Sequence, residues 1–209
     1  QVLAQKAQEK ASAENPEDGN EKADEVKRTY YPNGQRKTVQ NYKDGKEDGK
    51  GAMWYENGQK WAEINFKDGE FDGKMTSWDE NGQIELETYY KDDKLNGKTT
   101  KWYENGQIEN EIYYKDDLPD GKSTIWRENG KKKSEMNFKD GKGDGNAISW
   151  YENGQIEKEE NFKDDKMVGN TIHRYYSNGQ KESETNYKDG KEDGKKTLWR
   201  ENGQKGSEI

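Results

Sequence analysis

The chain has 209 residues, of which 38% are charged and 26% hydrophobic, and its formal net charge is -8. Lys is finely mixed with Asp and Glu, so there is no basic stripe to attract phosphate, which argues against nucleic acid and anionic membrane as partners. No apolar run approaches the roughly 18 residues of a membrane span. Because the chain has no Cys, disulfides and thiolate metal sites are excluded.

The first 27 residues differ in composition from the rest, with Ala, Glu, Lys and Gln dominating. We expect a helix over Val2 to Ala13, which is marginal because isolated helices of this length are barely stable in water. A break and a linker follow, so residues 1–27 are assigned as a helical or disordered linker and residues 28–209 as a repeat domain. The chain starts at Gln1 without Met, as a mature form after signal removal or a fragment would. We expect the cell envelope or secretion, with the cytoplasm as the alternative.

An internal repeat organises the remainder of the chain. Asn-Gly pairs recur every 24 residues, with a single 25-residue step between Gly154 and Gly179. A period of this size indicates a solenoid or array in which neighbouring units complete one another's apolar surface. The low apolar content then suffices, because many apolar residues are Trp, Tyr or Phe, each able to bury on the order of 150–250 Å².

Each unit from Thr29 onward reads as strand, tight turn, strand and wider turn, as in Lys50 to Tyr55 followed by Lys60 to Lys67. Strands joined this tightly must be antiparallel neighbours. The sequence therefore predicts an all-β fold: an elongated, single-layer antiparallel meander of about sixteen strands. The extra residue of the 25-residue step lies within Asn170 to Tyr176 and is what a β-bulge requires.

The length of the tight turn decides which side chains share a face. A two-residue Asn-Gly turn pairs Trp54 with Trp61, whereas a three-residue Glu-Asn-Gly loop, a type I turn closed by a left-handed Gly, places Trp54 over Lys60. We predict the three-residue loop because it gathers one aromatic face. That face contains Trp54, Trp78, Trp102, Trp126, Trp150 and Trp199, with Ile64, Ile84, Leu86, Ile112 and Met136 and a ladder of Tyr42, Phe66, Tyr90, Tyr114, Phe138, Phe162 and Tyr187.

The opposite face is then predicted to be polar. It carries a column formed by Glu63, Glu87, Glu111, Glu135, Glu159 and Glu184. Neighbouring members lie two strands apart, roughly 9–10 Å, and nothing in a flat ladder makes one carboxylate differ from the next. A cross-strand charge ladder is favoured over paired catalytic carboxylates.

Other catalytic and metal-binding chemistry finds little support in the sequence. The Asp spacing of the wide turns does not match a calcium loop, and interleaved Lys would repel a cation. His173 is the single histidine, which excludes a multi-histidine site. No phosphate loop, dinucleotide fingerprint or nucleophile elbow is present. The sequence thus indicates no catalytic residue, no cofactor and no metal ligand.

The repeated unit resembles a known family. An aromatic residue, Lys-Asp-Gly-Lys, a second Gly and Tyr-Glu-Asn-Gly-Gln resemble the MORN repeat, especially its longer variant, most clearly in Phe66 to Gln83 and Phe138 to Gln155. The resemblance covers about Thr29 to Ile209 and implies elongated sheets of hairpins that act as scaffolds, dimerisation modules or protein-binding surfaces. Some members have been proposed to bind phospholipid, which the acidic balance here disfavours, and bacterial members are often labelled antitoxins.

The aromatic face is the feature that most strongly suggests a binding function, because a single-layer sheet has no second layer to cover it. We expect a non-enzymatic scaffold that binds a protein partner or a second copy of itself through Trp54, Trp78, Trp102, Trp126, Trp150, Trp199, Phe66, Tyr90, Tyr114, Phe138 and Phe162. An antitoxin or immunity role falls within this class. The alternative is an extracellular carbohydrate or cell-wall binding module that stacks sugars on Trp54, Trp78, Trp102 and Trp126.

Overall fold

The computed structural model describes residues 24–209, apart from the side chains of residues 170–172. Over this range the chain is all-β without a helix, as predicted, and the first strand begins at Glu25. The chain divides into two compact units, one ending at Gly97 and the other beginning at Lys98. The predicted helix at Val2 to Ala13 lies outside the described residues.

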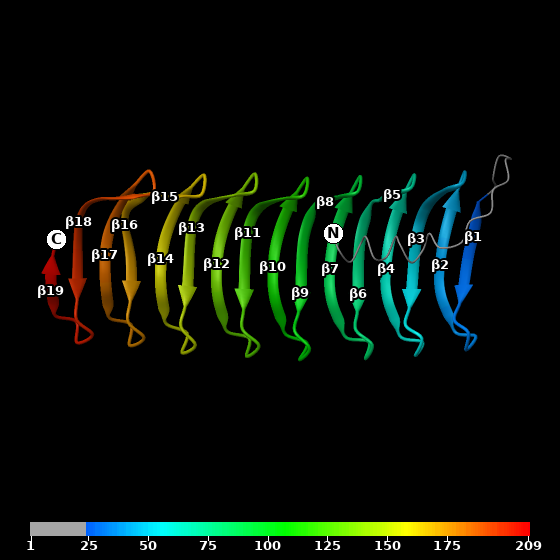
Figure 1. Ribbon diagram of the computed structural model, residues 1–209, viewed down its shortest axis with the longest axis horizontal. Helices are drawn as coiled ribbons and strands as arrows, with labels where there is room; N and C mark the ends of the chain where they lie inside the picture. Colours follow the sequence, from blue (N-terminus) through cyan, green and yellow to red (C-terminus); the bar gives the residue numbers. More distant parts are fainter. Residues whose placement is uncertain (1–23) are drawn as a thin grey trace. The chain divides into compact units, whose positions relative to one another are not determined.

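The first unit is an open antiparallel meander, in which strands adjacent in sequence pair with one another (Figure 1). β4 pairs with both β5 and β6, because β5 is a two-residue strand separated from β6 by Asp72 alone. The strands are β1 (Glu25–Tyr30), β2 (Arg36–Lys43), β3 (Lys46–Trp54), β4 (Lys60–Lys67), β5 (Glu70–Phe71), β6 (Gly73–Trp78), β7 (Ile84–Lys91) and β8 (Lys94–Leu95).

The second unit repeats this pattern from β9, whose first residue is the last of the first unit. Its pairings are again antiparallel between sequence neighbours, and β14 pairs with both β15 and β16. The strands are β9 (Gly97–Trp102), β10 (Ile108–Lys115), β11 (Leu118–Trp126), β12 (Lys132–Lys139), β13 (Lys142–Trp150), β14 (Ile156–Lys163), β15 (Lys166–Met167), β16 (Gly169–Tyr175), β17 (Lys181–Lys188), β18 (Lys191–Trp199) and β19 (Lys205–Glu208). Each unit is thus a single-layer meander of hairpins, as the sequence predicted.

The tight turns have the predicted three-residue loop. Gly58 N donates to Tyr55 O over 3.0 Å, and Tyr55 N donates to Gln59 O over 2.8 Å, which encloses Glu56, Asn57 and Gly58. Gly58 has φ of +88°, a left-handed conformation that glycine adopts without the steric cost of a Cβ. Trp54 consequently pairs with Lys60, and the same arrangement pairs Trp78 with Ile84.

A second irregularity follows each tight turn and was not predicted. The register shifts by one residue at Trp61, because Trp54 pairs with Lys60 while Met53 pairs with Ala62. This is a β-bulge, and it shifts the register by one residue in the sense opposite to the loop. The body of each hairpin therefore has the faces that a two-residue turn would give. The equivalent bulged residues elsewhere are Lys37, Glu85, Lys133, Glu157, Glu182 and Gly206.

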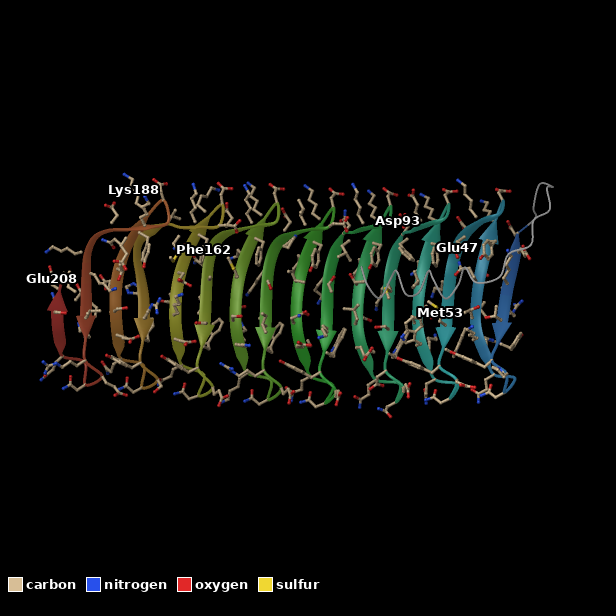
Figure 2. The ribbon with its side chains drawn as sticks, in the orientation of Figure 1. Glu47, Met53, Asp93, Phe162, Lys188 and Glu208 are labelled. Atoms are coloured by element: carbon tan, nitrogen blue, oxygen red, sulfur yellow. The ribbon has the colours of Figure 1, made fainter. Side chains whose placement is uncertain are left out.

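Each wide turn is closed by two consecutive residues that both have positive φ. These are Asp68 and Gly69 in one turn and Asp92 and Asp93 in the next. Such turns match the twist of the strands they join. Neighbouring wide turns are linked, because Gly69 N donates to Glu47 O over 2.8 Å and Asp93 N donates to Phe71 O over 3.1 Å; Figure 2 labels Glu47 and Asp93. Asp93 adds a side-chain bond, since its Oδ1 accepts from Phe71 N at 2.7 Å.

One face of the first unit holds its hydrophobic core, and we call it the core face. It is lined by Met53, Ala62, Ile64, Phe66, Phe71, Met75 and Tyr90, each less than 10% exposed. The ring centroids of Phe66 and Phe71 lie 5.0 Å apart, and those of Phe71 and Tyr90 lie 5.4 Å apart. Register places Ile112, Tyr114, Met136, Phe138 and Phe162 on the core face of the second unit, where they are only half-buried.

The 25-residue step produces the predicted bulge. β16 pairs with β17 through Gly169 opposite Tyr187 and Ile172 opposite Thr185. Between these two pairs β16 contains one residue more than β17. Regular pairing resumes at His173 opposite Glu184. The insertion is thereby absorbed inside the strand, and the tight turn that follows keeps its normal geometry.

Candidate interaction surface

The Trp column lies on the face opposite the core, which we call the charged face. Lys60 shows this directly, because its Nζ is 2.8 Å from Glu63 Oε2 and 5.3 Å from the centroid of the Trp78 ring. Lys132 and Lys181 make the same pair of contacts in the second unit, bridging Glu135 to Trp150 and Glu184 to Trp199. Trp and Glu therefore share a face.

The prediction of a single aromatic face was therefore wrong for its six Trp residues and for Ile84. The bulge after each tight turn moves Trp54, Trp78, Trp102, Trp126, Trp150 and Trp199, together with Ile84, to the side of the Glu column. Phe66, Tyr90, Tyr114, Phe138 and Phe162 do lie together, on the core face. Trp61, which was not predicted as a site residue, packs against the core cluster.

Cations cover several of the Trp rings. The guanidinium carbon of Arg36 is 5.2 Å from the Trp54 ring centroid, and the Lys181 Nζ is 5.1 Å from that of Trp199. Contacts of this kind contribute roughly 0.5–1 kcal/mol at exposed sites. A sugar stacking on Trp54 or Trp78 would first have to displace Arg36 or Lys60, which weakens the carbohydrate-binding alternative.

Most members of the Glu column are paired with one or two lysines. Glu63 accepts from Lys60 at 2.8 Å and from Lys50 at 3.2 Å. The hydrogen bond from Lys60, with help from Lys50 and against the effect of burial, lowers the pKa of Glu63. Such pairs on an exposed face contribute about 0–1 kcal/mol each, as in a structural charge ladder.

The Tyr-Glu-Asn-Gly-Gln motif serves the connection between repeats. Tyr55 donates its hydroxyl to Trp78 O over 2.9 Å, and Asn57 Nδ2 donates to Glu80 O over 2.8 Å, both in the following turn. Asn57 Oδ1 also accepts from Gln59 N at 2.9 Å, which fixes the loop itself. Equivalent hydroxyl bonds are made by Tyr31, Tyr103, Tyr151 and Tyr176.

We expect the contribution of the Tyr55 hydroxyl hydrogen bond to stability to decrease at alkaline pH. Burial and the nearby carboxylates, Glu85 first, raise the pKa of Tyr55 to about 12, from about 10 in an unfolded chain. Because the folded pKa is the higher one, the contribution is complete below about pH 10 and disappears as the pH rises through about 12. Tyr55→Phe should cost about 0.5–1.5 kcal/mol at neutral pH.

Urea unfolding of both proteins at neutral pH and across this alkaline range provides the measurement. The difference between them should shrink as the pH rises. A difference that stays constant through the alkaline range would show that the hydroxyl proton contributes nothing.

Sequence reasoning missed one cluster on the charged face of the second unit. His173 lies directly opposite Glu159 on one side and Glu184 on the other. Tyr175, which occupies the Trp column, donates its hydroxyl to Glu159 Oε2 over 2.9 Å. The signals in the sequence were the 25-residue step, the single His and the replacement of Trp by Tyr, each of which appears only as a departure from the repeat.

Comparison with protein families agrees with this open single-layer β-repeat architecture. The model of the MORN repeat variant matches residues 26–44, 47–68, 71–92, 95–116, 119–140, 143–164 and 174–189. The chain belongs to the MORN repeat variant family, whose repeats form scaffolds and are often protein-interaction modules. No curated protein matches the chain. Between residues 24 and 209, no helix has the length and apolar character needed to cross a membrane.

Proposed function

We propose that the chain is a non-enzymatic scaffold that binds a protein partner on the core face of its second unit. The observation that carries this proposal is the half-buried state of that face in a single-layer sheet. Ile125 is 37% exposed, and Ile112, Met136 and Phe138 on the same face are only partly covered. Apolar surface of this kind gains free energy when a partner removes it from water.

The charge of the chain favours a partner other than a second copy. A net charge of -8 makes two copies repel one another, whereas a basic protein would be attracted and steered toward the scaffold. An antitoxin would be one instance of this function, with a toxin as the partner. The Tyr and Asn side chains of the turn motif are engaged in the repeat connections described above, so they contribute no chemistry to it.

Site-specific photocrosslinking tests the proposal. p-Benzoylphenylalanine placed at Ile125, on the core face of β11, should crosslink one basic protein in extracts of cells that produce the chain. The same group placed at Lys122, on the charged face of the same strand, is the matched control. The purified partner should then bind stoichiometrically to the full chain, and Ile125→Lys should weaken binding about tenfold or more, as for a central apolar contact.

Three results would contradict the proposal. Crosslinking of the same protein with equal yield from Ile125 and Lys122 would remove the face assignment. Binding of the purified partner that is unchanged by Ile125→Lys would do the same. A stable homodimer by light scattering that is lost with Ile125→Lys would show that a second copy, rather than a different protein, covers this face.

A further inference from the structure

The ion-pair ladder of the charged face follows a regular rule in most hairpins. A lysine two residues before the cross-strand partner of each Glu reaches that Glu diagonally, as Lys98 reaches Glu111 over 2.7 Å and Lys50 reaches Glu63 over 3.2 Å. Lys74 with Glu87, Lys122 with Glu135 and Lys195 with Glu208 form the equivalent pairs. The fold thus provides a defined place for one ammonium group beside each carboxylate of the column.

Glu159 lacks both the diagonal lysine and the lysine three residues before it. Its diagonal position holds Asn146 in place of Lys, and the residue three before it is Ile156, where Glu63, Glu135 and Glu184 have a lysine. Glu184 also lacks the diagonal lysine, because Thr171 stands at that position, but it keeps Lys181. Among the side chains described between residues 24 and 209, no cation lies within ion-pair distance of Glu159. In that set, the hydrogen bond to its carboxylate comes from Tyr175.

A cavity occupies the place where the missing lysine would lie. It has a volume of about 220 Å³ and lies between β13, β14 and β16. On the charged face, its lining consists of Asn146, Ile148, Glu159, Asn161 and His173. These residues supply one carboxylate, two carboxamides that offer carbonyl oxygens and an aliphatic wall for a methylene stem.

The surrounding groups keep Glu159 available as an acceptor. Burial and the hydrogen bond to Glu159 raise the pKa of Tyr175 to about 12, so the hydroxyl remains a donor at neutral pH. His173 Nδ1 is buried without a hydrogen-bond partner among the described residues, 3.6 Å from Glu184 Oε2. Glu184 itself is paired with Lys181 at 2.6 Å. The unbalanced charge at this place is therefore the carboxylate of Glu159.

We propose that this cavity binds a primary ammonium group, supplied by a lysyl side chain of a partner protein. The incoming ammonium takes the place that the ladder lysine takes in most other hairpins, with Glu159 as its counter-ion and the carboxamides of Asn146 and Asn161 as further acceptors. An ammonium carries three donors and no acceptor, which matches this set of oxygens. The site is on the charged face, opposite the surface of the proposed function, so that each proposal can fail without the other.

Titration of the isotopically labelled full chain with Nα-acetyl-lysine N-methylamide tests the site by NMR. We expect saturable, millimolar-range shifts of the Asn146 and Asn161 side-chain amides and of the His173 imidazole. Nε-acetylated probe, which lacks the charge, should produce none of them. Glu159→Gln keeps an acceptor for Tyr175 but removes the charge, and it should weaken binding at least about tenfold, as loss of a charge-assisted contact does.

Two further variants complete the experiment. Asn146→Lys supplies an internal ammonium to the cavity and should abolish binding of the probe while leaving the chain folded. Glu135→Gln is the matched control, because Glu135 is already paired with Lys122 and Lys132, and it should leave the shifts unchanged. The proposal is overturned by shifts that persist in Glu159→Gln or Asn146→Lys, by equal shifts with the acetylated probe, or by the absence of shifts. Tighter binding of putrescine than of the lysyl probe would overturn the assignment to a protein side chain.

Discussion

Ile64→Ala should lower the free energy of unfolding by about 2–5 kcal/mol, the range for truncation of a buried aliphatic side chain. Ile64 is 2% exposed and belongs to the core cluster of the first unit. Truncation removes apolar contacts from a layer that is one sheet thick, where few neighbouring side chains are available to close the cavity. Urea unfolding gives the total loss, and amide hydrogen exchange should locate it in β3 to β7.

Ile112→Ala is the matched control for this experiment, because Ile112 takes the place of Ile64 in the second unit but is only half-buried. Its loss should be clearly smaller, since less area returns to water. Repeat arrays unfold by nearest-neighbour steps, so the exchange data are needed to show that each effect stays in its own unit. Equal losses at the two positions would mean that burial on the core face does not distinguish the units.

Gly73→Ala should cost about 1–3 kcal/mol, the range for a residue held in a sparsely populated backbone region. Gly73 has φ of +106°, and an added Cβ would come 3.2 Å from the Cβ of Asn65. Asn65 has little room to withdraw, because its Nδ2 donates to Lys74 O over 2.6 Å. Strain and close approach therefore act together at this position.

Gly154→Ala separates the two effects. Gly154 has φ of +90°, but an added Cβ there has no atom within 4 Å. Gly154→Ala should therefore cost only the strain of holding Ala in the left-handed conformation, about 1–2 kcal/mol. Urea midpoints of both variants, measured with unchanged slopes, provide the comparison. If Gly73→Ala is no more destabilising than Gly154→Ala, the contact with Asn65 has relaxed at no cost.

The features that were predictable from the sequence are those that recur in every repeat. The 24-residue period, the hairpin order and the Glu-Asn-Gly loop follow from the regular return of Asn-Gly pairs and from the need for a left-handed glycine. The bulge after the loop could not be read in the same way, because the bulged residue is Trp61 in one hairpin, Glu85 in the next and Gly206 in the last. A backbone feature without a preferred side chain leaves no compositional signal.

One indirect signal for the faces was nevertheless present. Lys60 precedes Glu63 by three residues, a spacing that places the two on opposite faces of a regular strand but on one face across a bulge. The same spacing recurs with Lys132 and Lys181. The cavity beside Glu159 could not be predicted from the sequence, because it depends on residues that depart from the repeat: Asn146, His173 and Tyr175.

The hydroxyl bonds between tight turns also bear on how such a chain changes over generations. The bonds from Tyr31, Tyr55, Tyr103 and Tyr176 each span 23 residues and end on the carbonyl of the Trp one repeat later. Duplication or deletion of a whole period reproduces this link without requiring any new contact. An insertion inside a period must be absorbed locally, as the bulge of β16 absorbs one residue while Tyr151 still reaches Tyr175 O over 2.8 Å. Gene length can therefore vary in units of one hairpin, and each new hairpin arrives with its own bond to the next.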